Sequence, residues 1–181
     1  MRHGTWARWI AVALACSLLP LGNVVAQTVN HGNVEFSVLN GVAFVSRDGE
    51  DATVLMTPVP PVWRLSFWSP SSVTIDFGLS ALRASEDEES FSILNLEGGV
   101  GVNLAPHNSK TVPFVGGMAG LISLGEEDDT ETKEYIGGQA GIRWFVRDYA
   151  AIRAQAAYRS IFVEGDNVGI VELVGGLSFF L

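Results

Sequence analysis

Large apolar residues alternate with small or polar ones along much of this chain, with a period of two residues. Between residues 73 and 83, apolar side chains occupy every second position, and polar or small residues lie between them. The same alternation returns over residues 136–145, 151–162 and 168–181. A period of two predicts β-strands that have one apolar face. After residue 26, no stretch shows the sustained period of an amphipathic helix.

The pattern divides the chain into eight strands joined by short connections. We predict them at residues 33–47, 53–68, 72–84, 90–104, 112–124, 135–146, 150–163 and 168–181. The second contains Pro58, Pro60 and Pro61, which cannot donate ladder hydrogen bonds, so its regular part is expected to begin at Val62. In the fifth predicted strand, apolar residues occupy both odd and even positions, so the alternation does not show which face is apolar. Consecutive strands with short connections predict an all-β, antiparallel up-and-down barrel.

The first 26 residues form a segment of their own. Basic residues at its start are followed by an apolar run over residues 10–21, and it ends at Ala26, before Gln27. These are the features of a cleaved secretory signal peptide, and the run is shorter than the ~20 residues of a spanning helix. We expect cleavage after Ala26, which leaves residues 27–181 as one barrel domain. A lipid-modified Cys16 is the alternative, because the only cysteine of the chain lies in this run.

Charge is distributed unevenly along the predicted barrel. The chain is 48% hydrophobic, yet its net charge is −9. Most of the 20 acidic residues lie in the first, third, fifth and seventh connections, and the connections between these carry almost none. Alternate connections of a meander share one end, so we predict a strongly acidic end and a nearly neutral one. The negative net charge argues against a nucleic-acid-binding protein, because such proteins are usually basic.

The direction of the apolar face distinguishes a soluble barrel from a membrane barrel. A soluble barrel turns this face inward, and a membrane barrel turns it outward to lipid. The polar face carries small residues and balanced acids and arginines, and no lysine lies in a predicted strand. Buried charges must be paired, and arginine suits buried multidentate pairing. We therefore predict a transmembrane barrel with an interior charge cluster: Glu35, Arg64, Asp76, Glu97, Arg143, Arg153, Arg159 and Glu172.

Aromatic residues concentrate near both ends of the predicted strands. Such girdles are typical of the two interfaces of a membrane barrel. The neutral end has Trp63, Phe67, Trp144, Tyr149 and Phe179, and the acidic end has Phe44, Tyr135 and Phe162.

Three segments carry a resemblance to a known family. Residues 143–148 read as a strand, an aromatic pair and a turn, residues 113–117 begin a glycine-rich strand, and residues 175–181 form an apolar ending. Together they resemble the eight-stranded outer-membrane β-barrels, which include outer-membrane proteins A and X and the opacity proteins. The resemblance covers the whole mature chain and implies a Gram-negative outer membrane, with both termini in the periplasm. It also implies two partners, outer-membrane lipid and the barrel-assembly machinery, which reads the last strand. The usual final residue is Phe, whereas this chain ends at Leu181.

These features predict a non-catalytic, monomeric barrel without cofactor or metal. Its role would be in envelope structure or in surface interaction through short acidic extracellular loops. Cleavage of the signal peptide would leave two histidines, His31 and His107, and both lie at the predicted neutral end. An acid–His–nucleophile set is therefore not expected at the outer rim. A soluble periplasmic barrel that binds an apolar ligand is one alternative. A narrow channel is the other, although eight strands enclose a space that side chains fill.

Overall fold

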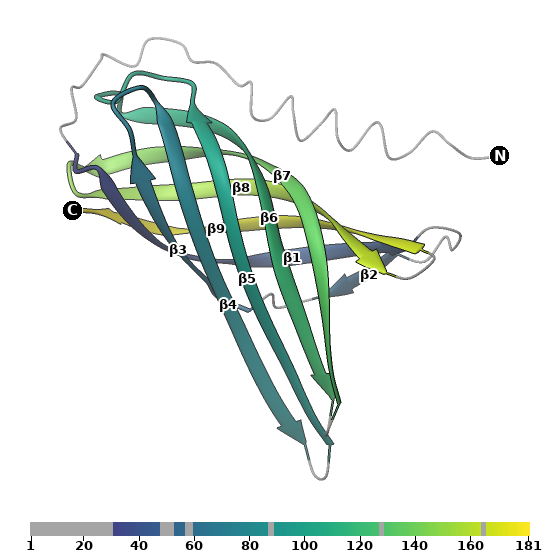
Figure 1. Ribbon diagram of the computed structural model, residues 1–181. Coiled ribbons are helices and arrows are strands. Elements are labelled where there is room, and N and C mark those ends of the chain that lie inside the picture. Colours follow the sequence, from purple (N-terminus) through teal and green to yellow (C-terminus); the bar gives the residue numbers. More distant parts are fainter. Residues whose placement is uncertain (1–30, 48–52, 57–59, 87–88, 127–128, 164–165) are drawn as a thin grey trace.

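The alternating segments form one antiparallel sheet that closes on itself (Figure 1). The structure, a computed structural model, describes residues 31–47, 53–56, 60–86, 89–126, 129–163 and 166–181. Each strand pairs with the next along the chain, and β1 also pairs with β9, which closes the barrel. The predicted signal segment 1–26 lies outside the described residues, as does part of each acidic connection.

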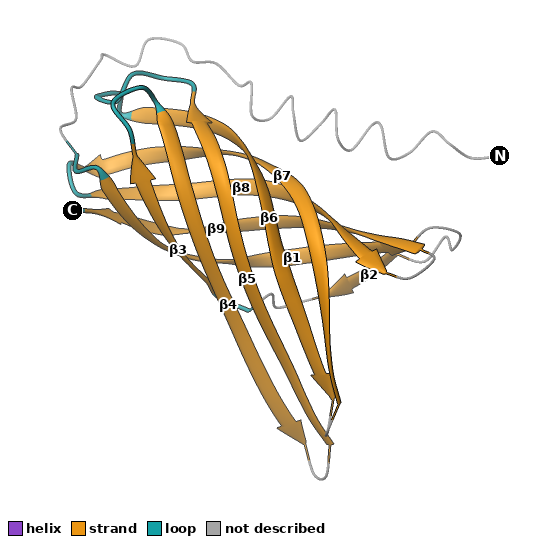
Figure 2. Ribbon diagram, in the orientation of Figure 1, coloured by secondary structure: helices purple, strands orange, loops and turns teal. Residues whose placement is uncertain are grey.

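Nine strand segments build the described barrel, and loops at one end connect them (Figure 2). Among the described residues, no helix is long and apolar enough to cross a membrane. The segments are β1 (Val34–Arg47), β2 (Thr53–Met56), β3 (Val62–Trp68), β4 (Val73–Glu86), β5 (Glu89–Asn103), β6 (Thr111–Glu126), β7 (Asp129–Arg147), β8 (Ala150–Val163) and β9 (Asp166–Phe180).

The second barrel strand is divided into β2 and β3. β2 pairs with β1 at residues 43–46, and β3 pairs with the same side of β1 at residues 34–39. The two segments therefore take the place of one strand, and the barrel has eight strands around its wall. The expectation that the regular part of the second strand begins at Val62 is confirmed by β3, although Thr53–Met56 also pair with β1 as β2. Pro60 and Pro61, which precede β3, have no amide hydrogen to give to a ladder.

The strands at the acidic end are longer than the sequence pattern predicted. β6 continues to Glu126 and β7 begins at Asp129, so Glu131, Lys133 and Glu134 lie in a strand rather than in a connection. The expectation that no strand holds a lysine is therefore wrong. A bilayer is crossed by roughly 9–11 residues of strand, and β7 has 19. Beyond the bilayer both faces of a strand meet water, so apolar alternation no longer marks its extent.

Side-chain facing follows the predicted alternation. Large apolar residues on the outer face are exposed, whereas residues at the intervening positions are buried inside. In β6, whose parity was ambiguous, Phe114 and Met118 face the interior, and Val115 and Leu121 face outward. The barrel is thus apolar outside and polar within, which is the reverse of a soluble protein.

Glycines on the inner face leave room for large side chains from neighbouring strands. A Cβ atom added to Gly120 would lie 2.6 Å from the Tyr135 ring and 2.3 Å from the backbone oxygen of Leu96. At Gly98, on the outer face, an added Cβ would meet no atom within 4 Å. The packed interior therefore requires glycine at 120, and the outer wall leaves open space at 98.

We expect Gly120→Ala to lower the free energy of unfolding by about 1–3 kcal/mol, the usual cost of overpacking. Gly98→Ala is the matched control and should change it by less than about 0.5 kcal/mol, as is common for surface changes. Urea titrations of the barrel in detergent micelles, followed by tryptophan fluorescence, measure both. Equal stability of the two variants would contradict the packing argument.

Candidate functional site

The structure places all eight residues of the predicted charge cluster inside the barrel. Each of these residues is at most 8% exposed. They come from seven strands and form two groups, one around Glu35 and one around Glu97. Acids and arginines are equal in number, so the cluster has no formal net charge.

Glu35 organises the group nearer the neutral end. Its Oε2 lies 2.8 Å from Arg143 Nε, and its Oε1 lies 3.2 Å from Arg153 Nη1. Trp68 Nε1 donates a hydrogen bond of 3.0 Å to Oε2, and the Ser178 hydroxyl donates one of 2.7 Å to Oε1. Both carboxylate oxygens are therefore occupied by donors from four other strands.

Glu97 organises the second group. It forms ion pairs with Arg64 and with Arg159, and Arg159 Nη2 lies 2.8 Å from Glu97 Oε2. Arg159 also pairs with Glu172. The Tyr135 hydroxyl donates to Glu97 Oε2 at 3.2 Å. Charges on β3, β5, β8 and β9 are thereby joined across the lumen.

Gln155 connects the two groups, and Gln139 adds Asp76 to the group around Glu97. Arg64 donates to the side-chain oxygens of Gln139 and Gln155, and Arg153 Nε donates to Gln155 at 3.0 Å. Gln139 Nε2 donates to Asp76 Oδ2 at 3.1 Å, so Asp76 joins the network through an amide. Sequence analysis missed both glutamines as site residues, although each has the inward parity of the nearest arginine on its strand.

Tyr135 does not belong to an aromatic girdle, and that prediction is wrong. It is 2% exposed and faces the lumen, where its hydroxyl also donates to Asn95 Oδ1 at 2.9 Å. Its parity with Gly137 and Gln139 already pointed inward. The aromatics predicted near the neutral end are all exposed, Tyr149 in the turn between β7 and β8 and the others on the outer face of strands: Trp63, Phe67, Trp144 and Phe179.

Aromatic rings fill the lumen at the neutral end. Trp68, Phe145 and Phe180 form a buried cluster, and the His31 ring stacks on Phe145 with centroids 4.5 Å apart. The His107 ring lies 3.9 Å from that of His31. We call these five residues the aromatic plug. Burial lowers the pKa of His31 below its ordinary value, and the neighbouring His107 acts in the same direction.

Apolar side chains line the lumen around Arg159, which lies between Ala157 and Ile161 on β8. Met118, Tyr135, Ala157 and Ile161 form a buried cluster there, with Ile122, Val163, Val168 and Ile170 packed against it. The lumen is thus aromatic at the neutral end, and farther along it the charged residues and apolar side chains lie side by side. No three His, Cys, Asp or Glu side chains within the described residues are grouped to hold a metal ion.

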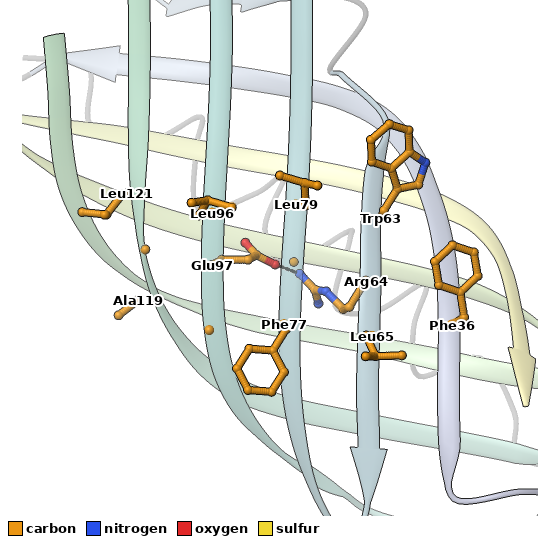
Figure 3. Close-up of a pocket in the computed structure, with 13 residues that line it drawn as sticks. Phe36, Trp63, Arg64, Leu65, Phe77, Leu79, Leu96, Glu97, Ala119 and Leu121 are labelled. Atoms are coloured by element: carbon orange, nitrogen blue, oxygen red, sulfur yellow. Dashed lines mark hydrogen bonds and ion pairs between the residues drawn. The ribbon is translucent and has the colours of Figure 1, made fainter. Parts of the chain in front are cut away.

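The barrel wall carries a groove of about 610 Å³ over β1 and β3–β6 (Figure 3). Outward apolar side chains line it, with Trp63, Leu79, Leu96 and Leu121 along one row of paired residues. Gly98 is among the residues that line the groove. The ion pair between Arg64 and Glu97 lies behind the strands, because both residues are buried inside the barrel.

Comparison with known proteins identifies the fold. No protein-family model matches the chain, and no curated protein sequence matches it. Among solved structures, Neisserial surface protein A (NspA) superposes with a TM-score of 0.66 at 14% identity, over 84% of this chain and 99% of that one. The outer membrane protein OprG from Pseudomonas aeruginosa superposes with a TM-score of 0.57 at 10% identity, over 84% and 98%. The chain therefore has the eight-stranded barrel fold of these proteins.

Replacing Glu35 by Gln should lower the free energy of unfolding by about 3–5 kcal/mol, because it leaves Arg143 and Arg153 buried without their carboxylate. Glu131→Gln is the control. It removes an exposed ion pair with Lys133, which should be worth at most about 1 kcal/mol. Urea unfolding in micelles compares the two variants. A Glu35 variant as stable as the control would show that the network contributes little to folding.

The depressed pKa of His31 predicts a loss of stability in mild acid. Because the unfolded chain binds this proton more readily than the barrel, the contribution of neutral His31 is present above pH 6.5 and is lost as the pH falls below that value. His31→Phe keeps the stacking and removes the titration. We expect the wild type to lose more stability than this variant between pH 7.5 and pH 5, measured by urea midpoints. Parallel pH profiles would refute the assignment to His31.

Proposed function

We propose that this chain is a non-catalytic integral outer-membrane barrel that serves envelope structure or surface interaction. The observation that carries the proposal is the inverted distribution of side chains. Large apolar residues around the outer wall are exposed, whereas acids and arginines are paired inside. An apolar surface of this extent on a soluble monomer would be an aggregation hazard, but it is stable against lipid.

Closure of the wall also supports the proposal that the barrel lies in a membrane. Hydrocarbon offers no hydrogen-bond partners, so a spanning sheet must have no free edge. The pairing of β1 with β9 runs from Glu35 to Arg47 and removes the edge between the first and last strands. The alternative of a soluble barrel with an apolar-ligand cavity requires the opposite facing. The names of the solved neighbours, a surface protein and an outer membrane protein, also favour this location.

The filled lumen favours a structural role over the alternative of a channel. Eight strands leave an interior that side chains can fill. Here the aromatic plug occupies the neutral end, and ion pairs across the lumen occupy the middle. An ion that entered would have to displace the paired carboxylates and guanidinium groups.

Any surface interaction would take place at the acidic end. Glu131 and Glu134 are exposed on β7, and the sequence places most other acids in the neighbouring connections. His31 and Leu181 lie at the opposite end, the periplasmic one in this proposal. We further propose a monomer whose β9, ending in Phe179 and Phe180, is recognised by the barrel-assembly machinery.

Cell fractionation tests the proposal. After expression with its own leader in a Gram-negative host, the protein should sediment with outer membranes and require detergent for release. On gels it should migrate differently before and after boiling, as folded barrels do. Recovery in the periplasmic supernatant without detergent would refute it.

Planar bilayer recordings test the filled lumen separately. The purified barrel should give no discrete and reproducible conductance steps, because the aromatic plug and the ion pairs occupy the lumen. Regular steps that disappear when the protein is boiled before reconstitution would favour the channel.

A further inference from the structure

We propose that the groove on the outer wall is a binding site for an acyl chain of a phospholipid from the inner leaflet of the outer membrane. The inference rests on the proposed function, because only a membrane-embedded wall meets acyl chains. It goes further in assigning one place on the wall, one leaflet and one class of lipid.

Register explains why the wall is hollow at this place. Across the sheet, Phe36 pairs with Leu65, Leu65 with Phe77, Phe77 with Gly98, and Gly98 with Ala119. Along this row the outward side chains become smaller, from the large side chains of Phe36, Leu65 and Phe77 to the hydrogen of Gly98 and the methyl group of Ala119. The next row towards the acidic end has large side chains throughout: Trp63, Leu79, Leu96 and Leu121. A depression therefore lies at Gly98 and Ala119, beside a ridge.

The lining of the groove suits a hydrocarbon chain. Its outward side chains are aromatic or aliphatic, and the two charged residues that contribute to it, Arg64 and Glu97, belong to the paired network on the lumen side. The groove, of about 610 Å³, is open along the wall, so a chain lying in it would stay in contact with the surrounding lipid. Lipid already surrounds this apolar wall in the proposed function, so the groove is continuous with the lipid-facing surface.

The course of the groove selects the leaflet. Phe36 is near the periplasmic start of β1, whereas Ala119 is midway along β6. Because the strands are staggered, the row that joins these residues rises from the periplasmic boundary towards the middle of the bilayer. A chain whose headgroup stays at the periplasmic surface can enter at the Phe36 end and lie along the row. The inner leaflet of a Gram-negative outer membrane is phospholipid, so the occupant is a phospholipid chain.

Filling the groove provides a direct test. Gly98→Leu and Ala119→Leu place a branched side chain on its floor, and Gly98 has no atom within 4 Å of an added Cβ. Gly175→Leu is the matched control. Gly175 is also exposed on the outer wall, on β9 and away from the groove, and its added Cβ would come no closer than 3.6 Å to another atom.

Each protein is purified from Gram-negative outer membranes in a mild detergent and examined by native mass spectrometry. Wild type and Gly175→Leu should retain a phospholipid one-to-one. In both groove variants the ratio of bound to free barrel should fall about tenfold, equivalent to about 1.4 kcal/mol of lost binding. The shift in gel mobility on boiling establishes that each variant is folded, and one folded groove variant is sufficient.

Four results would overturn the proposal: undiminished phospholipid on a folded groove variant, an equal loss in Gly175→Leu, retention of lipopolysaccharide instead of phospholipid, or a second copy of the chain on the wall. These results differ from failure of the proposed function. A barrel that fractionates with outer membranes but holds no phospholipid refutes only the groove, whereas a periplasmic protein refutes both.

Discussion

The requirement that each charge in the lumen have an ionic or hydrogen-bonding partner restricts how the strands of this barrel can be arranged. Glu35 on β1 binds arginines from β7 and β8, and Glu97 on β5 binds arginines from β3 and β8. A one-residue slip of any of these strands would move its charge to the outer face, where a charged side chain in hydrocarbon is expensive. The ion pairs therefore fix which face of each strand is inside. They also tie together strands that are far apart around the wall.

This interior is crowded, and the crowding shapes the outer wall as well. Long side chains such as Glu97 and Tyr135 must cross a lumen only eight strands wide, so the inner positions opposite them are Gly78 and Gly120. On the outer face, the neighbouring positions Gly98 and Ala119 are small too. Three neighbouring strands, β4, β5 and β6, contribute these small residues. The ion pair inside and the hollow outside thus occupy the two sides of the same stretch of sheet.

Much of this architecture could be predicted from the sequence. The features that could not be predicted have physical reasons. Alternation located the strands and their apolar faces, because lipid imposes a period of two. It failed at Lys133 and Glu134, near the acidic end of β7, where consecutive residues rather than alternate ones are at least partly exposed. Tyr135 was also assigned to a girdle, because its place near a predicted strand end does not show whether the ring faces outward or into the lumen. The contacts of Asp76 with Gln139 depend on the stagger between strands, which no local pattern contains.

The sequence of environments along the lumen limits what the barrel can do. Towards the acidic end, apolar side chains such as Ile161 lie beside the ion pairs of Arg159 with Glu97 and Glu172. A cation that entered would meet these apolar side chains and charges that are already paired. At the far end the aromatic plug blocks the exit. This filling of the lumen agrees with the proposed structural role, in which the outer wall and the acidic end make the contacts with the surroundings.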